Sequence, residues 1–233
     1  MSEQGYTYLR TFRYERKFLV DTLMPFQVAA LIKQHPRLFN TPYPPRYVNN
    51  LYLDTTDMVN YFENVDGAMQ RRKVRVRWYG EPFGEITRPM LEVKIKEGMV
   101  GTKRTYPLAP FQMDSRFCSR TLHHIFSKSD LPDEAQLNLR NLDVVLFNRY
   151  YRHYYATHDV AFRLTLDTKQ SFYKINGLFR NQFIHHQKNS SDVIVELKYE
   201  VEQEPHANRV SGFFPFRVTR NSKYVQGIER VYF

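Results

Sequence analysis

Alternation of apolar and charged residues with a period of two is the feature that most constrains the fold of this chain. In the segment KVRVRWYG, residues 73–80, Lys73, Arg75 and Arg77 take every second position, and Val or Trp fills the positions between them. Successive side chains of a β-strand point to opposite faces of the sheet. The segment is therefore predicted to form a strand with one cationic face and one apolar face.

Similar alternation recurs along the chain, in segments whose Val, Ile, Tyr, Phe and Thr content is typical of strands. These segments are residues 12–20, 46–54, 73–80, 90–98, 144–157, 160–170 and 192–201. Gly and Asn at 80–84, 98–101 and 176–177 are typical of the hairpin turns between them. Capping residues and periodicity predict short helices over 24–34, 55–64, 114–126, 132–141 and 222–231. We therefore predict a mainly antiparallel β (α+β) fold and, at 233 residues, a single domain spanning 1–233.

Basic residues dominate the charged faces of these strands. The chain carries 34 Lys and Arg against 24 Asp and Glu, a formal net charge of +10, and such an excess is typical of proteins with anionic partners. Cations at neighbouring positions of a sheet repel each other unless an anion lies between them. An ordinary half-exposed sheet, whose polar face meets water, is the alternative interpretation.

A barrel would gather the charged faces in one place. If about eight strands close, alternate side chains point into the lumen, so we predict an eight-stranded closed β tunnel with a charged lumen, flanked by short helices that cover the apolar outer face. Arg binds phosphate oxygens bidentately and Lys adds point charges, so a phosphate compound is the expected occupant. Glutamates among them suit a hard divalent cation, Mn²⁺ or Mg²⁺.

The motifs, taken in order, resemble those of the VTC domain, the polyphosphate polymerase module of the vacuolar transporter chaperone complex, within the triphosphate tunnel metalloenzyme (CYTH-like) group. The motifs are E-x-K at 15–17, R-x-R at 75–77, EVKIK at 92–96, NR at 148–149, RLTLDT at 163–168, ELK at 196–198 and SKY at 222–224. The resemblance extends over residues 13–227. It implies a tunnel that binds triphosphate or polyphosphate with a divalent metal and transfers the γ-phosphate of ATP onto a growing phosphate chain.

The resemblance also implies roles for individual residues. The expected phosphate ligands are Lys17, Arg75, Arg77, Lys94, Lys96, Lys103, Arg149, Arg163, Lys198 and Lys223. The expected catalytic residues are Arg75, Arg77, Arg149, Arg163 and Glu196, with Arg149 and Arg163 stabilising charge on the transferring phosphoryl group. Glu196 is the first candidate ligand for Mn²⁺ or Mg²⁺, and Glu15 and Glu92 are further candidates.

Phosphoryl transfer depends on positioning and charge neutralisation more than on a protein nucleophile, and no P-loop, kinase or G-x-S-x-G motif occurs in the sequence. We therefore expect a phosphotransferase, an ATP-dependent polyphosphate polymerase. Its partners would be ATP or another nucleoside triphosphate, inorganic polyphosphate, and phosphate or pyrophosphate, with no specific nucleic acid.

Two other functions stay open. One is a triphosphatase or other triphosphate hydrolase of the same tunnel fold, and the other is a non-catalytic module that binds polyphosphate or another polyanion. The chain has one cysteine and no apolar run long enough to span a bilayer, from which we expect a cytoplasmic location. Whether a membrane protein is a partner is also open.

Overall fold

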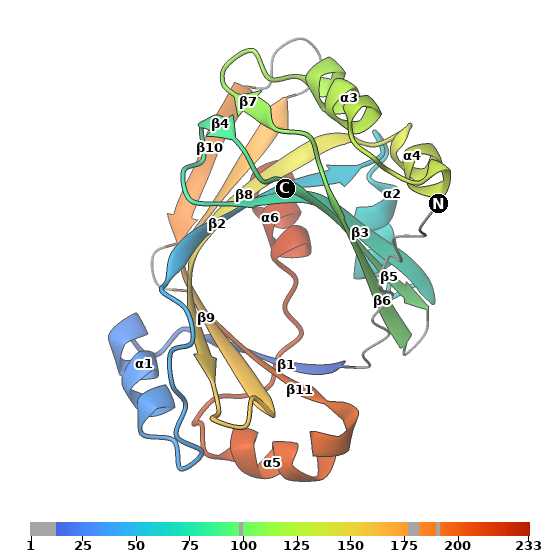
Figure 1. Ribbon diagram of the computed structural model, residues 1–233. Coiled ribbons are helices and arrows are strands. Elements are labelled where there is room, and N and C mark those ends of the chain that lie inside the picture. Colours follow the sequence, from blue (N-terminus) through green and yellow to red (C-terminus); the bar gives the residue numbers. More distant parts are fainter. Residues whose placement is uncertain (1–12, 98–99, 177–181, 190–191) are drawn as a thin grey trace.

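A computed structural model describes residues 13–97, 100–176, 182–189 and 192–233 (Figure 1). Its main feature is a nine-stranded antiparallel sheet. The strands of this sheet are β1 (Arg13–Val20), β2 (Arg46–Asp54), β3 (Gln70–Tyr79), β5 (Met90–Glu97), β6 (Val100–Pro107), β8 (Asp143–Ala156), β9 (Phe162–Asn176), β10 (Gln182–Asn189) and β11 (Val193–Glu200). A second, two-stranded sheet pairs β4 (Gly84–Ile86) with β7 (Phe111–Met113).

Short helices connect and cover the strands. They are α1 (Pro25–Lys33), α2 (Val59–Val65), α3 (Ser119–Lys128), α4 (Asp133–Leu139), α5 (Glu204–Gly212) and α6 (Lys223–Tyr232), with a 3₁₀ turn over Val201–Gln203. Each helix in the described ranges is too short or too polar to span a bilayer. The predicted helices at 24–34, 55–64, 114–126, 132–141 and 222–231 are confirmed as α1, α2, α3, α4 and α6.

The large sheet curls but does not close. Its strand order is β1-β11-β9-β8-β2-β3-β5-β6, with β10 paired to β9, and Figure 1 shows the strands bending around a central opening. The end strands β1 and β6 do not pair with each other within the described residues. The predicted closed barrel is therefore wrong, and the sheet is an open half-barrel.

The free edge of β1 has another partner, which explains why the sheet stays open. Phe18 forms a bridge with Val218, and the backbone N–H of Thr219 donates to the carbonyl of Lys17 at 2.7 Å. The Thr219 hydroxyl in turn accepts from the N–H of Leu19 at 3.1 Å. The segment before α6 thus satisfies edge groups of β1 that β6 would otherwise have to pair.

The convex face of the sheet is apolar and lies under the helices. Helices α1 and α5 cover β1, β9 and β11, where Leu164 and Leu197 are fully buried. Helices α3 and α4 and the two-stranded sheet cover β3 and β5, where Val76 and Trp78 are buried. The apolar face of KVRVRWYG therefore packs against the outer shell, as its alternation predicts, and its cations face the other side.

Helix α6 lies on the concave face, inside the curl of the sheet (Figure 1). Its buried Tyr224 and Ile228 pack against Leu146 and Phe172 of the inner surface. The helix approaches the sheet closely at Gly227, where an added Cβ would lie 2.7 Å from Phe172 Cδ1 and closer still to Leu146 Cδ2. A glycine is needed at this point because the contact leaves no room for a side chain.

A buried carboxylate joins α6 to its neighbours. Asp54, at the end of β2, accepts hydrogen bonds from the backbone N–H groups of Asn60 and Tyr61 at 2.9 Å each and from the hydroxyl of Tyr224. Burial and the Asp54 charge raise the pKa of Tyr224 far above its ordinary value, so the hydroxyl keeps its proton. Strand β2 and helices α2 and α6 are therefore held by one side chain.

The strands β4, β6, β7 and β10 and the helix α5 were not predicted from the sequence. The β6 sequence VGTKRTYP has few apolar residues to mark a buried face, and α5 contains Pro205 and polar residues through most of its length. The predicted turns at 98–101 and 176–177 lie partly outside the described residues. β6 and β10 pair with the strands that precede them, β5 and β9, and pairing with a neighbouring strand can make a strand of a segment whose own pattern is weak.

We expect Gly227→Ala to lower the free energy of unfolding by roughly 1–3 kcal/mol because the new methyl group overpacks the contact with Leu146 and Phe172. The effect should appear in urea denaturation even though Ala is the better helix former. Gly212→Ala at the end of α5 is the matched control, since an added Cβ there meets nothing within 4 Å. An equal decrease in the free energy of unfolding in both variants would contradict the close packing of α6 against the sheet at Gly227.

Candidate functional site

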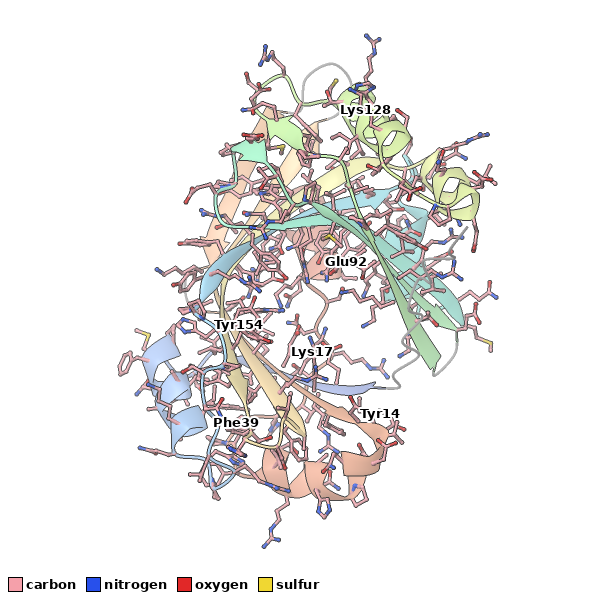
Figure 2. All side chains as sticks on the ribbon, in the orientation of Figure 1. Tyr14, Lys17, Phe39, Glu92, Lys128 and Tyr154 are labelled. Atoms are coloured by element: carbon pink, nitrogen blue, oxygen red, sulfur yellow. The ribbon has the colours of Figure 1, made fainter. Side chains whose placement is uncertain are left out.

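Charged side chains gather on the concave face of the sheet. The apolar faces of β1, β3, β5 and β11 are buried under helices, so alternate positions of these strands face inward, and Figure 2 shows Lys17 and Glu92 directed to the central opening. The basic side chains of this face outnumber the acidic ones. They are Lys17, Lys73, Arg75, Arg77, Lys94, Lys103, Arg152, Lys198 and Lys223, against Glu15, Glu92, Asp167 and Glu196.

Glu92 is the centre of the first ion cluster. Arg75 donates to its Oε2 from Nε at 2.8 Å and from Nη2 at 2.6 Å. Lys103 Nζ lies 2.6 Å from Oε1, and Arg77 Nη1 lies 3.5 Å from the same oxygen. Burial alone would raise the pKa of Glu92, but these three cations outweigh it and hold the pKa far below its ordinary value. Glu92 therefore stays ionised and fixes three cations in place.

Neutral groups orient the two arginines further. Arg75 donates to the Tyr52 hydroxyl at 3.1 Å, and Arg77 donates to Asn50 Oδ1 at 2.9 Å and to the Tyr150 hydroxyl at 3.3 Å. Asn50 and Tyr52 stand directly opposite these arginines on β2. The guanidinium planes are thus set before any ligand binds, which reduces the cost of ordering them around an anion.

Glu196 is the centre of the second cluster. Lys198, Lys223, Arg152 and Lys17 lie 3.2, 3.4, 3.6 and 3.7 Å from its carboxylate oxygens. Burial would raise its pKa, and the four cations instead hold the pKa well below the ordinary value. One buried carboxylate thus gathers cations from three strands and α6.

Asp167 completes this cluster from β9. Arg152 contacts it with Nε and Nη2 at 2.6 and 2.7 Å, and Lys223 Nζ lies 2.6 Å away. Burial alone would lower the pKa of Lys223, but Asp167 and Glu196 raise it far above its ordinary value. Lys223, which begins α6, is therefore permanently charged and bonded to both carboxylates.

An ion pair joins the end strand β1 to β5, the neighbour of the other end strand β6. Glu15 on β1 lies 3.6 Å from Lys94 on β5 and 3.4 Å from Lys17. Burial and the charge of Glu196 raise the pKa of Glu15, but Lys17, Lys198 and Lys94 lower it below its ordinary value overall. Charge attraction therefore acts where backbone pairing between the end strands is absent among the described residues.

Most of the residues expected to bind phosphate lie on the concave face. Lys96 shares the face of Lys94 near the end of β5. Arg163 stands opposite Lys198, at the end of β9, with Nη2 3.8 Å from Glu200. The structure thus places Arg163 beside the second cluster and away from Glu92.

Arg149 lies on the opposite side of the sheet. It pairs in register with Asn49, which stands opposite Trp78 of the convex core, and its guanidinium stacks on the Tyr47 ring at 3.6 Å. The expectation that Arg149 faces the charged side is corrected, and Arg152 is the β8 arginine that does so. Arg149 was assigned from the NR motif of the resemblance, and the tyrosines at 150 and 151 leave no apolar face in the sequence against which that assignment could be checked.

Sequence reasoning did not name three charged side chains of the concave face as site residues, namely Lys73, Arg152 and Asp167. Asp167 follows Arg163 by four residues in the alternating segment of β9, so the two side chains lie on the same face of the strand. The alternation therefore already indicated that Asp167 faces the charged side. Lys73 likewise lies on the same face of β3 as Arg75, two residues away, and it stands opposite Lys94. For Arg152 the sequence gives no comparable signal.

The carboxylates differ in how well they suit a metal. Glu15 and Glu196 both contact Lys17 and therefore lie together, whereas Glu92 is held by other cations. No group of three or more His, Cys, Asp or Glu side chains within the described ranges is arranged to hold a metal ion. A site of one or two carboxylates completed by phosphate oxygens is the usual arrangement for Mg²⁺, and Glu15 with Glu196 fits it.

Comparisons with known proteins place this geometry in context. A family model described as the VTC domain matches residues 12–232. A solved structure of a candidate adenylate cyclase from Vibrio parahaemolyticus aligns with a TM-score of 0.50 and 13% identity, covering 93% of this chain and 98% of that chain. A candidate adenylyl cyclase from Hippeastrum, described as having a dominant triphosphatase activity, aligns with a TM-score of 0.46 and 14% identity, covering 93% and 95%. No curated protein matches the sequence. The Vibrio structure shows a shared fold.

We expect Glu92→Gln to lower the free energy of unfolding at pH 7 by roughly 2–4 kcal/mol, because three cations lose their shared counter-charge. The folded-state pKa of Glu92 is depressed, so its contribution is complete above its unfolded pKa of about 4.3 and is lost as the pH falls below that value. Chemical denaturation at pH values from 7 down to 3 should therefore show the difference in free energy of unfolding between variant and wild type becoming smaller. Glu97→Gln, at an exposed position on the same strand, is the control, and a difference that does not change with pH would contradict the assignment.

Proposed function

The chain belongs to the VTC domain family, and we propose on that basis that it is a metal-dependent polyphosphate polymerase, which transfers the γ-phosphate of ATP onto a growing phosphate chain. The observation that carries the proposal is the excess of fixed cations on the concave face. Every phosphate of such a chain is anionic near neutral pH, so it supplies the counter-charge that this face lacks.

The first cluster is the proposed binding site for the triphosphate. Arg75 and Arg77 are held by Glu92 and by neutral partners on β2, and their remaining N–H groups can donate to phosphate oxygens. Lys103 is half-exposed and adds a further charge beside them. Tyr150 lies between the two clusters, because Arg77 donates to its hydroxyl and Lys223 Nζ lies 4.8 Å from its ring.

The second cluster is the proposed binding site for the growing chain and the metal. Glu196 and Glu15 would hold Mn²⁺ or Mg²⁺ together with phosphate oxygens, and such an ion, when bound, offsets charge on those oxygens. Lys17 and Lys198 lie beside these carboxylates and would bind the phosphates of the chain. Glu92 is less suited to the metal because Arg75 and Lys103 already occupy its oxygens.

The transfer step needs no protein nucleophile. An ionised terminal oxygen of the chain forms a new bond to the γ-phosphorus, the bond from that phosphorus to the β-γ bridging oxygen breaks, and ADP leaves with the bonding electron pair. The terminal oxygen is already deprotonated near neutral pH, so a general base is not required. The role left to the protein is alignment of the two anions and neutralisation of their mutual repulsion.

The function is tested by incubating the purified chain with ATP and either Mn²⁺ or Mg²⁺. We expect long-chain polyphosphate, detected by gel electrophoresis and by ³¹P NMR signals of interior phosphates. Release of free phosphate without polymer would replace the proposal with triphosphate hydrolysis. Binding of polyphosphate without turnover would replace it with a non-catalytic module.

The combined variant Arg75→Ala with Arg77→Ala should lose at least roughly 100-fold in affinity for ATP, since two charge-assisted phosphate contacts are removed. Binding is measured by isothermal titration calorimetry. Arg72→Ala is the matched control because Arg72 lies on the same strand but points outward to Asn138. Arg149→Ala should also keep its affinity because Arg149 faces the convex side. Unchanged affinity in the double variant would show that these arginines do not bind the nucleotide.

A further inference from the structure

Lys73 differs from the other cations of the concave face in its partners. Its Nζ donates to the Ser222 hydroxyl at 3.0 Å, and within the described part of the chain it forms no ion pair. Arg75 and Arg77, on the same face of β3, both share the carboxylate of Glu92. Lys73 is therefore a partly buried amine without a paired carboxylate in the part of the chain that the structure describes.

Four cations lie near Lys73. Lys17 faces it from β1, Lys94 from β5, and Arg71 and Arg75 from its own strand. Burial and the repulsion from these four cations lower the pKa of Lys73 to about 7. At neutral pH the side chain is thus divided between its charged and neutral forms.

The carboxylates near Lys73 already form ion pairs with other cations. Glu15 is bonded by Lys17 and Lys94, and Glu196 and Asp167 are bonded by Lys223, the residue after Ser222. An additional anion is therefore what would restore the full charge of Lys73.

The start of α6 contributes further groups that suit an anion. Ser222 is the N-cap residue, and its hydroxyl also accepts from the N–H of Val225 at 3.4 Å, so the positive end of the helix dipole lies next to Lys73. Asn221 precedes it and is nine-tenths buried, yet neither side-chain atom of its amide has a hydrogen-bond partner among the described residues. Buried amides are normally paired. The side-chain amide of Asn221 has N–H groups available to donate, and Lys17 Nζ lies close by, because it donates to the backbone carbonyl of Asn221 at 3.0 Å.

We propose that Lys73, Ser222 and Asn221 form a further phosphate subsite at the start of α6, and that Lys73 takes up a proton when a phosphate chain binds there. The proposal rests on the proposed function, because it adds a subsite to the same basic face. A phosphate placed between Lys73 and the Asn221 amide supplies the missing counter-charge and accepts a hydrogen bond from each. Phosphate binding at this face is thereby linked to pH.

The sign of the linkage follows from the free and bound states. Lys73 is mostly neutral in the free protein above pH 7 and is charged in the complex, so binding consumes a proton. The affinity of wild type should consequently fall by roughly tenfold for each pH unit above 7, compared with a variant whose charge at this position is permanent. Arginine supplies that permanent charge.

The test uses tripolyphosphate as the probe and isothermal titration calorimetry of the full chain at pH 8, in two buffers of different ionisation enthalpy. Wild type should take up roughly 0.9 proton more per bound tripolyphosphate than Lys73→Arg. Protons exchanged by the ligand and by all other groups are the same in the two proteins, so the difference between wild type and Lys73→Arg reports Lys73 alone. Between pH 7 and pH 9, affinity should fall more steeply in wild type than in Lys73→Arg.

Two further variants complete the design. Lys33→Arg, on the exposed side of α1, should match wild type in proton uptake. Lys73→Met should bind roughly tenfold more weakly than wild type at pH 6.5, where Lys73 is mostly charged, and thermal unfolding reports whether it folds. If it does not, the pair of wild type and Lys73→Arg still decides the question.

The two levels of the proposal fail in different ways. Wild type that does not bind tripolyphosphate would overturn the proposed function itself. Wild type that binds, with proton uptake and pH dependence equal to those of Lys73→Arg, would overturn the subsite alone and leave the proposed function in place.

Discussion

The ion pairs of Lys223 with Asp167 and Glu196 are the interaction on which the inner face of the molecule depends. Lys223 begins α6, and its bonds to two buried carboxylates hold the start of the helix against β9 and β11. Without Lys223, Asp167 would keep Arg152 as its one ion-pair partner among the described residues, and the first turn of α6 would lose this anchor. Because breaking a buried pair leaves uncompensated charge, the helix is strongly fixed inside the curl. Its apolar side fills one part of the concave face and leaves the other part to the charged groups.

The few acids of this face organise the many cations. Glu92 gathers three cations and Glu196 gathers four, so each carboxylate sets the positions of several phosphate-binding groups without cancelling their total charge. Fixed cations cost little reorganisation when an anion arrives. Lys73 is the exception, since among the described residues its one bonded partner is a neutral hydroxyl. This is why the pH dependence of binding is expected at that residue and not at Arg75 or Arg77.

The sequence predicted the strand faces well where alternation was clear. Arg75, Glu92, Lys94, Glu196 and Lys198 all lie on the concave side, and Trp78 lies on the convex side. It failed where the pattern was ambiguous or weak. On β8 the NR motif led to Arg149 in place of Arg152, and the adjacent tyrosines gave no clear alternation to correct it. The polar sequences of β6 and α5 concealed those elements.

The sequence by itself determined which side chains share a face of a strand, because alternation is a local property of extended backbone that each strand expresses alone. It also determined the family, through short motifs in a fixed order. Only the tertiary structure decided that the sheet stays open, because the edge of β1 is taken by the segment at 218–219, about 200 residues further along the chain. It alone decided which acid meets which cation, and that Lys73 meets none within the described residues, because those distances depend on strand order and on where α6 docks.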